Sequence, residues 1–206
     1  MAHFDDISDE VRVSIASQAA PLIARHDRTA LGAPGQPMVL GTSLREELLT
    51  LGAIRGTEQV SMQETGQTLS VLSAPGEHVP LGAGPGKAAR EVGYVLARPR
   101  PGVELGTAAP EEWSVSAVSA SNLAARIQSA LLWIDENVDG DPLVRVLSIP
   151  SFQLTALALH RDDDVVGVVA LPTENDTRFE PNHVYAMDEF IGRLRELPSA
   201  EGLTLD

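Results

Sequence analysis

The segment from Asp141 to Leu171 constrains the fold more than any other part of the chain. It contains three apolar runs, which a proline and a triple aspartate separate from one another. Strands buried on both faces have such nearly continuous apolar runs, whereas strands with one face in water alternate apolar and polar residues. The pattern therefore predicts three central strands, near residues 143–149, 152–160 and 165–171.

Two short features mark the boundaries between these strands. Pro150 has no backbone N–H to donate to a strand ladder, so it predicts a bend after the first strand. Asp162, Asp163 and Asp164 predict a hairpin turn, because aspartate favours turns and three like charges resist burial. Each run is shorter than the roughly 20 residues that a membrane-spanning helix needs. We therefore expect a covered sheet.

Two helices are predicted to flank the strands. Between residues 118 and 138, apolar residues recur at three- and four-residue spacing, and Ser119 or Ser121 can cap the N-terminus. Leu132 and Trp133 widen the apolar surface beyond one stripe, which favours packing between two layers or at an oligomer interface. Residues 181–197 repeat the helical spacing. The expected fold class is α+β, with a mixed or antiparallel sheet that these helices pack against.

The first half of the chain predicts a looser mixture of elements. Residues 5–25 have helical spacing with acidic residues at the N-terminal end, and Pro21 is expected to kink or end this helix. Ser43 and Glu46 have the spacing of a capping box, which predicts a short helix that stops at Gly52. The N-terminal half is therefore expected to contain at least two helices.

Strand signals follow, and then a candidate domain boundary. Residues 60–72 predict a weak hairpin with Gly66 in its turn, and residues 91–97 predict a further strand. The segment after that strand is irregular and rich in proline and glycine. It divides the chain into an expected N-terminal half (residues 1–105) and a C-terminal half (residues 111–198). A single domain that shares one core is the alternative.

Composition excludes several classes of function. The formal net charge is −14, whereas nucleic-acid binding depends on Lys and Arg that neutralise phosphates, so we expect no nucleic-acid partner. The absence of cysteine excludes disulfides, thiolate catalysis and cysteine-ligated metal sites. A single lysine, Lys87, against fourteen arginines is typical of a GC-rich bacterial genome.

The expected compartment is the cytoplasm. The first residues are acidic and have no apolar run after a basic start, so they do not have the pattern of a secretory signal peptide. No stretch approaches the length of a transmembrane helix, and we expect no association with membranes.

One motif suggests a metal site. Asp135, Asn137, Asp139, Gly140 and Asp141 match the opening of a calcium loop, D-x-[DN]-x-[DN]-G, at the end of a predicted helix. The twelfth position, where a bidentate glutamate is expected, is a valine, and a strand follows in place of a second helix. The preferred interpretation is a polar helix-to-strand turn in which Gly140 ends the helix.

The remaining candidates are weaker. The segment from Gly82 to Lys87 lacks both the first glycine and the Ser or Thr of a phosphate-binding loop. His160 precedes the triple aspartate and can hold a metal at a hairpin tip, although a solvated acidic turn is the preferred interpretation. A Ser–His–Asp set can still assemble in space. The sequence therefore assigns no catalytic, cofactor-binding or metal-ligating residue, and no cofactor is expected.

Two function hypotheses remain. The preferred one is a non-catalytic protein-interaction or assembly protein of a bacterial cytoplasm, which binds a protein partner or itself through the Trp133 helix or the C-terminal helix. The alternative is a small-ligand-binding protein or hydrolase with a pocket formed by the loops at residues 74–87 and 98–110, because long irregular loops are often functional.

Overall fold

The structure is a computed structural model of the 206-residue chain. It describes residues 7–26, 39–56, 60, 62–73, 91–119, 121–162, 164–173 and 178–196. Its helices and strands are, in chain order, α1 (Asp9–His26), β1 (Val39–Leu49), α2 (Leu51–Arg55), β2 (Met62–Ser73), β3 (Glu91–Pro99), η1 (Pro110–Glu112), β4 (Trp113–Ser119), α3 (Leu123–Asn137), β5 (Leu143–Ile149), η2 (Pro150–Phe152), β6 (Leu154–Arg161), β7 (Asp164–Ala170), β8 (Val184–Tyr185) and α4 (Met187–Arg195).

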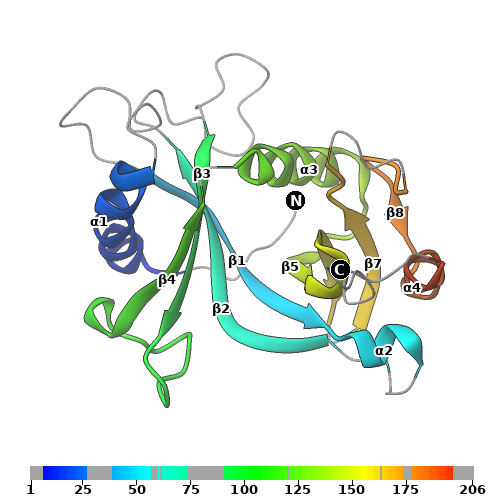
Figure 1. Cartoon of the computed structure of the whole chain (residues 1–206), viewed down its shortest axis with the longest axis horizontal. Helices are drawn as coiled ribbons and strands as arrows, with labels where there is room; N and C mark the ends of the chain where they lie inside the picture. The colour runs from blue at the N-terminus through cyan, green and yellow to red at the C-terminus, as the bar shows by residue number, and fades with distance from the viewer. Residues whose placement is uncertain are drawn as a thin grey trace, which may run out of the picture. The chain divides into compact units, whose positions relative to one another are not determined.

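The described strands form one mixed sheet in the order β4-β3-β2-β1-β5-β6-β7-β8 (Figure 1). Strands β1 and β5 pair in parallel, whereas β2–β3, β3–β4, β5–β6, β6–β7 and β7–β8 pair in antiparallel fashion. Helices pack against this sheet, so the expected α+β class with a mixed sheet is confirmed. Strands β5, β6 and β7 all have a neighbour on both sides, as predicted for the segment from residue 143 to 171.

The chain divides into two compact units, each assembled from separate sequence segments. Unit 1 comprises residues 1–4, 45–65 and 133–206, and unit 2 comprises residues 5–44 and 66–132. Strands β1 and β2 and helix α3 contribute residues to both units. The irregular segment at residues 98–112 lies within unit 2, and the division into halves at residues 105 and 111 stays a prediction.

In unit 2, helix α1 packs on strand β4. The buried side chains of Val11, Ile15 and Ala19 recur at helical spacing and join a cluster that includes Val95 and Trp113. Pro21 lies inside α1, which continues to His26, so of the two expected effects of Pro21, a kink or an end of the helix, the end is wrong. The buried residues on both sides of the proline hold the helix against its partner strand, and this packing offsets the lost backbone hydrogen bond.

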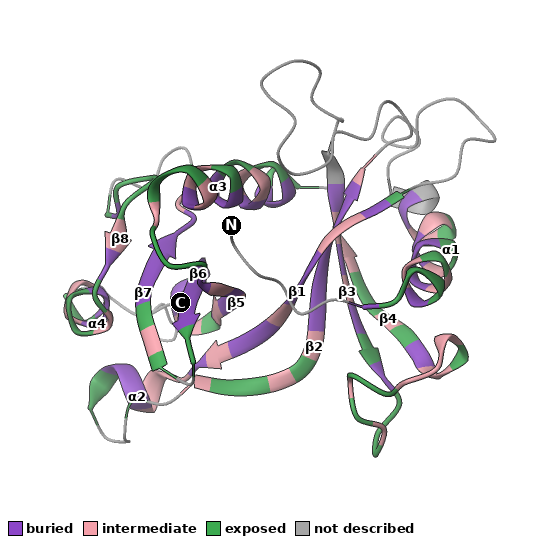
Figure 2. Cartoon of the chain, turned by 180° about the vertical axis from the view of Figure 1, so that it is seen from behind, coloured by how far each residue is buried: buried purple, intermediate pink, exposed green. Residues whose placement is uncertain are grey.

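The three strands at the centre of unit 1 are covered on both faces. The adjacent residues Val146 and Leu147 point to opposite faces of β5, and both are 0 % exposed. Figure 2 shows buried residues along β6 and the second half of β7. Pro150 opens the short helix η2 and confirms the predicted boundary. The predicted second strand starts too early, because Phe152 belongs to η2 and Gln153 has a left-handed backbone (φ 51°).

The predicted helix at residues 43–52 is wrong, because most of this segment belongs to strand β1. The two residues of the supposed capping box bind partners on neighbouring strands. The hydroxyl of Ser43 hydrogen-bonds that of Ser70 (2.7 Å), and a carboxylate oxygen of Glu46 accepts from the hydroxyl of Ser148 (2.6 Å). Tertiary pairing therefore overrides the local capping signal. Gly52 lies inside α2 and does not stop a helix.

The predicted hairpin at residues 60–72 is also wrong. Residues 62–73 form the single strand β2, and Gly66 has a left-handed backbone (φ 69°) within it. A glycine in this conformation suits a local irregularity inside a strand as well as a turn. The glycine at position 66 therefore does indicate a special backbone conformation, but the chain does not reverse its direction there.

Both flanking helices are shorter than predicted. Helix α3 begins at Leu123, because residues 118 and 119 still belong to β4. The backbone carbonyl of Asn122 accepts the first intrahelical bond, from the N–H of Arg126 (3.0 Å), so the N-cap position is Asn122 and not Ser119 or Ser121. The hydroxyl of Ser121, one residue earlier, accepts from the N–H of Leu123 (3.3 Å). Helix α4 begins at Met187, because Val184 and Tyr185 pair with β7 as strand β8. The helical start at residue 181 is therefore wrong.

Candidate functional site

The candidate site is built around Glu47, a carboxylate inside a covered strand of unit 1. Its side chain is only 4 % exposed, and a carboxylate removed from water is unstable unless it is paired. Glu47 has two partners. Its Oε1 accepts from Nη1 of Arg145 at 2.8 Å, and its Oε2 lies 3.0 Å from Nε2 of His160. We call these three residues the triad.

Strand register brings the triad together. Glu47 pairs with Leu147 across the parallel β1–β5 ladder, and Leu143 pairs with His160 across the antiparallel β5–β6 ladder. Paired residues share a face of the sheet, and so do residues two apart on one strand. Arg145 therefore lies on the same face as Glu47 and His160, between them along the order of strands.

The carboxyl of Glu47 is held in its ionised form. Burial acts to raise its pKa, but hydrogen bonds from His160 and Arg145 and the electrostatic interaction with both partners outweigh burial. The pKa of Glu47 therefore lies below its ordinary value of 4.5. Arg145 also donates from Nη1 to Oε1 of Glu64 at 2.8 Å, and Glu64 is 55 % exposed. The guanidinium thus connects a buried carboxylate to one at the surface.

The triad forms one wall of a pocket of about 370 Å³ within unit 1. The other described polar residues of the lining are Glu64 and Asp162, and both are exposed to solvent. A pocket of this volume falls within the range of about 300–1,000 Å³ that small-molecule sites occupy. The site therefore combines a buried charged wall with a solvent-exposed acidic rim.

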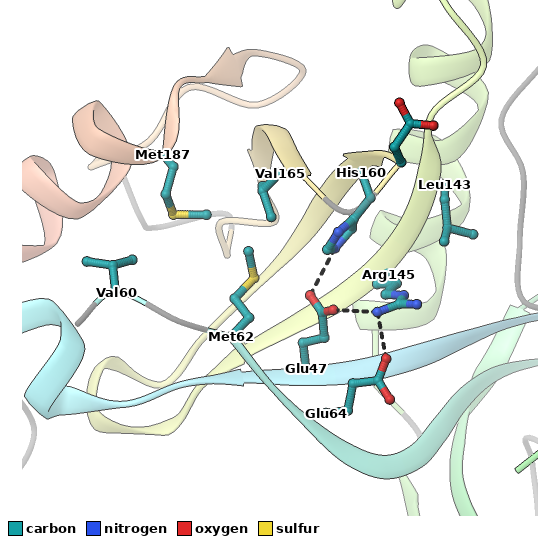
Figure 3. Close-up of a pocket in the computed structure, with 10 residues that line it drawn as sticks. Glu47, Val60, Met62, Glu64, Leu143, Arg145, His160, Val165 and Met187 are labelled. Atoms are coloured by element: carbon teal, nitrogen blue, oxygen red, sulfur yellow. Dashed lines mark hydrogen bonds and ion pairs between the residues drawn. The ribbon is translucent and has the colours of Figure 1, made fainter. Parts of the chain in front are cut away.

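The rest of the described lining is apolar. It consists of two methionines and three aliphatic residues, namely Val60, Met62, Leu143, Val165 and Met187. Figure 3 shows the side chains of Val60, Met62 and Met187 on one side of the pocket and those of Arg145 and Glu64 on the other. The pocket is therefore amphipathic. Thioether side chains are flexible and polarisable, so this wall can adapt to ligands of different shape.

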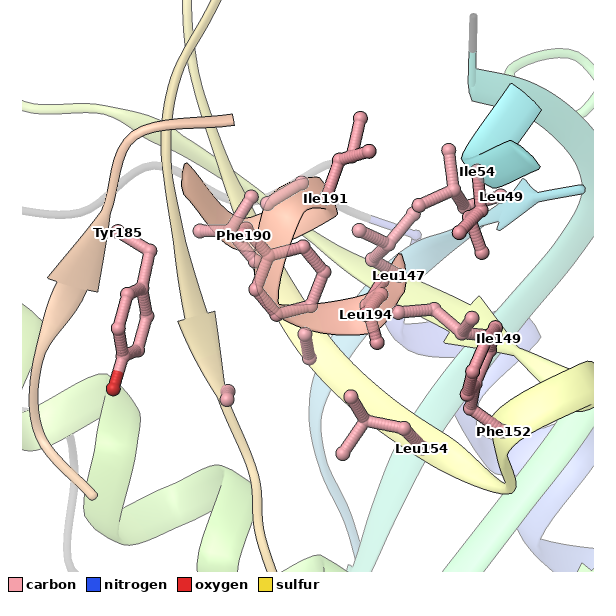
Figure 4. Close-up of a cluster of buried hydrophobic side chains, with 14 of the residues drawn as sticks. Leu49, Ile54, Leu147, Ile149, Phe152, Leu154, Tyr185, Phe190, Ile191 and Leu194 are labelled. Atoms are coloured by element: carbon pink, nitrogen blue, oxygen red, sulfur yellow. The ribbon is translucent and has the colours of Figure 1, made fainter. Parts of the chain in front are cut away.

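A hydrophobic cluster supports the same face of the sheet. Helix α4 contributes Phe190, Ile191 and Leu194, which lie beside Leu147 and Ile149 of β5 (Figure 4). Phe190 and Leu194 are 0 % exposed. Because Leu147 is two residues from Arg145, this packing fixes the strand that carries the guanidinium and so limits movement of the triad.

The calcium-loop residues form a helix-to-strand turn. Helix α3 ends at Asn137, Gly140 has a left-handed backbone (φ 86°), and strand β5 begins at residue 143. Nη2 of Arg161 donates to the backbone carbonyl of Asp139 (3.1 Å), and Asp141 also has a positive φ (47°). The part of the chain that the structure describes contains no group of three or more acidic or histidine residues arranged around a common metal position.

The other sequence candidates have mixed outcomes. His160 is 7 % exposed as a whole residue, and its Nε2 lies 3.0 Å from a carboxylate oxygen of Glu47. The segment from Gly82 to Lys87 and the loop at residues 74–87 lie outside the described residues. The loop at residues 98–110 contributes no residue to the described lining of the pocket.

The sequence does contain a signal for the triad. Glu47 stands in a segment of buried residues, and Arg145 is the one charged residue of the mostly apolar strand at residues 143–149. A charge inside a covered strand requires a partner of opposite sign. His160 ends the next apolar run. Which residue pairs with which charge depends on the register of the strands, and the periodicity of the sequence does not predict that register.

No protein-family model, curated protein or solved structure matches this chain. Among the described residues, no helix combines the length and apolar character needed to cross a membrane.

Proposed function

We propose that this chain is a non-catalytic binding protein that takes up a small molecule in the triad pocket of unit 1. The observation that carries the proposal is the pairing of an apolar wall with a buried network of ion pairs in one cavity. Small-molecule sites have this character, with mostly apolar lining and a few placed polar groups that fix orientation.

The lining favours binding over catalysis. Among its described residues none carries a hydroxyl or a thiol that His160 could activate as a nucleophile. Nε2 of His160 is engaged by Glu47, and the carboxylate of Glu47 is also bound by Arg145. These groups hold one another in place, which suits preorganised recognition.

A thermal-shift screen with metabolites of all charge classes tests the proposal. Val165 lines the pocket, whereas its neighbour Val166 does not line it and is 43 % exposed. We expect ligands that raise the melting temperature of the wild type and of Val166→Phe but not of Val165→Phe, because the larger side chain fills the cavity. A screen without any stabilising ligand, or ligands insensitive to Val165→Phe, would refute the proposal.

A second candidate is a protein-interaction or assembly role for helix α3. Leu132 is 42 % exposed, and its neighbour Trp133 is only partly buried. Exposed large apolar residues beside an aromatic one are typical of interaction surfaces. Size-exclusion chromatography with light scattering tests the self-association version. We then expect an oligomer that Leu132→Gln dissociates, and a monomer at high concentration would refute this version.

The net negative charge of the chain bears on the class of partner. At a formal net charge of −14, the chain repels phosphate backbones, which supports partners other than nucleic acid. We also propose a bacterial cytoplasm as the location, and the excess of arginine over lysine supports the bacterial origin.

A further inference from the structure

We infer that the ligand of the triad pocket is an organic cation, an ammonium or guanidinium group on a small apolar body. This inference rests on the proposed function and concerns its ligand. The described lining has three carboxylates, those of Glu47, Glu64 and Asp162, but one guanidinium, that of Arg145. Its formal charge is −2 with His160 neutral and −1 with His160 protonated, so the pocket attracts positive charge.

The two basic groups of the pocket are already engaged by carboxylates. Nη1 of Arg145 donates to Glu47 and Glu64 at 2.8 Å each, and Nε2 of His160 lies 3.0 Å from the second oxygen of Glu47. An anionic ligand would compete with both carboxylates for Arg145, the one guanidinium of the described lining. Separating Glu47 from its partners would leave buried charges unpaired, which is costly.

The acidic rim is available to a cation. Glu64 binds Arg145 through Oε1, and a carboxylate has acceptor capacity on both of its oxygens. Asp162 is exposed beside the pocket, at the start of the β6–β7 turn, where its backbone is left-handed (φ 55°). An ammonium group at this rim can therefore donate a charge-assisted hydrogen bond to the carboxylate of Glu64 or of Asp162.

The opposite wall fits the apolar body of such a ligand. Met62 and Met187 present thioethers, and Val60 and Val165 present methyl groups. A volume of about 370 Å³ accommodates a short alkyl chain or an aromatic ring. The pocket thus has an apolar wall and an acidic wall, which match the apolar body and the charged end of such a ligand.

Isothermal titration calorimetry with three probes of the same chain length tests the inference. We expect hexylamine to bind at least tenfold more tightly than 1-hexanol, and hexanoate to bind most weakly, because one favourable charge interaction changes affinity by about this factor. Val165→Phe should abolish binding of hexylamine, whereas Val166→Phe should leave it unchanged. Equal or tighter binding of 1-hexanol or hexanoate would overturn the inference.

Charge variants at the rim separate a local effect from the general acidity of the chain. We expect Glu64→Gln to weaken hexylamine about tenfold and Asp162→Asn severalfold, with the affinity for 1-hexanol unchanged in both. Asparagine tolerates the left-handed backbone at this position. The matched control is Glu189→Gln, which removes a half-exposed carboxylate on α4 that does not line the pocket. A loss with Glu189→Gln equal to that with Glu64→Gln would overturn the inference.

The outcomes distinguish failure of the inference from failure of the proposed function. If neutral or anionic molecules bind and Val165→Phe blocks them, the pocket is a binding site but its ligand is not a cation. If neither the three probes nor any compound of the thermal-shift screen binds, both the inference and the proposed function fail.

Discussion

Replacing Glu47 with glutamine removes one negative charge from the interior of unit 1 and changes the volume of the side chain little. In the wild type this carboxylate is 4 % exposed and joins Arg145, whose side chain is 16 % exposed, to His160 at 8 %. In Glu47→Gln, both basic partners lose the charge that compensates for their removal from water. Arg145 keeps only its contact with Glu64 among the described carboxylates of the pocket.

The expected loss of stability follows from these contacts. Removing one partner of a buried ion pair costs about 3–5 kcal/mol. The amide oxygen of glutamine can still accept from Arg145, and Glu64 remains as a second partner, so we expect about 2–3 kcal/mol for Glu47→Gln. The matched change Glu64→Gln removes a carboxylate that is 55 % exposed and should cost less than about 1 kcal/mol.

Urea denaturation at pH 7, followed by circular dichroism, measures both free energies of unfolding. Far-ultraviolet spectra of the two variants before denaturation control for loss of the fold. The reasoning would be refuted if Glu47→Gln cost less than about 0.5 kcal/mol, or no more than Glu64→Gln, because the triad would then contribute no buried electrostatic stabilisation.

Further predictions concern pH dependence and packing. Because the pKa of Glu47 is lowered below 4.5 in the folded chain, its ionised form stabilises the fold above about pH 4.5, and this contribution is lost as pH falls through the folded pKa. The difference in melting temperature between wild type and Glu47→Gln should therefore shrink below pH 4.5, and a difference unchanged at pH 3 would contradict this. A Cβ at Gly167 would lie 2.5 Å from Cγ1 of Val184, so Gly167→Ala should cost about 1–3 kcal/mol in urea denaturation. The control Gly192→Ala, which meets no atom of the described chain within 4 Å in the middle of α4, should stabilise by about 0.5–1 kcal/mol. Phe190 is 0 % exposed, and Phe190→Ala should cost about 3–5 kcal/mol, so a loss below 1 kcal/mol in the same assay would contradict the packing of α4.

Local patterns predict strands β5, β6 and β7 well because their signal is strong. Strand β5 has the predicted bounds, since Pro150 stops the ladder at a defined residue. The β6–β7 hairpin was also predicted, because aspartates at its turn and apolar runs on both sides indicate the same structure. In these segments local preference and tertiary packing agree.

Prediction fails where tertiary contacts decide between two local possibilities. Ser43 and Glu46 fit a helix cap by spacing, yet their side chains bind partners on neighbouring strands. Val184 fits a helical stripe, yet it pairs with β7 together with Tyr185, and α4 starts only after them. In both cases a strand partner distant in sequence overrides the local period.

The site was missed for the same reason. Glu47, Arg145 and His160 are far apart in the sequence, and only the ladders that join β1, β5 and β6 bring them to one face. Each residue alone predicts a buried charge that needs a partner, but the identity of the partner depends on register. The pocket beside them also includes Met62 and Met187, which no motif connects.

The central claim is that the triad pocket of unit 1 binds a ligand, and the methyl groups of Met62 and Met187 report on it directly because both side chains line the pocket. The measurement is a methyl NMR titration of methionine-labelled protein with hexylamine and with each ligand from the thermal-shift screen, in which Met62→Leu and Met187→Leu assign the two signals. We predict saturable shifts of both signals in the wild type and their loss in Val165→Phe. If both signals stay unchanged with every compound, the claim is contradicted.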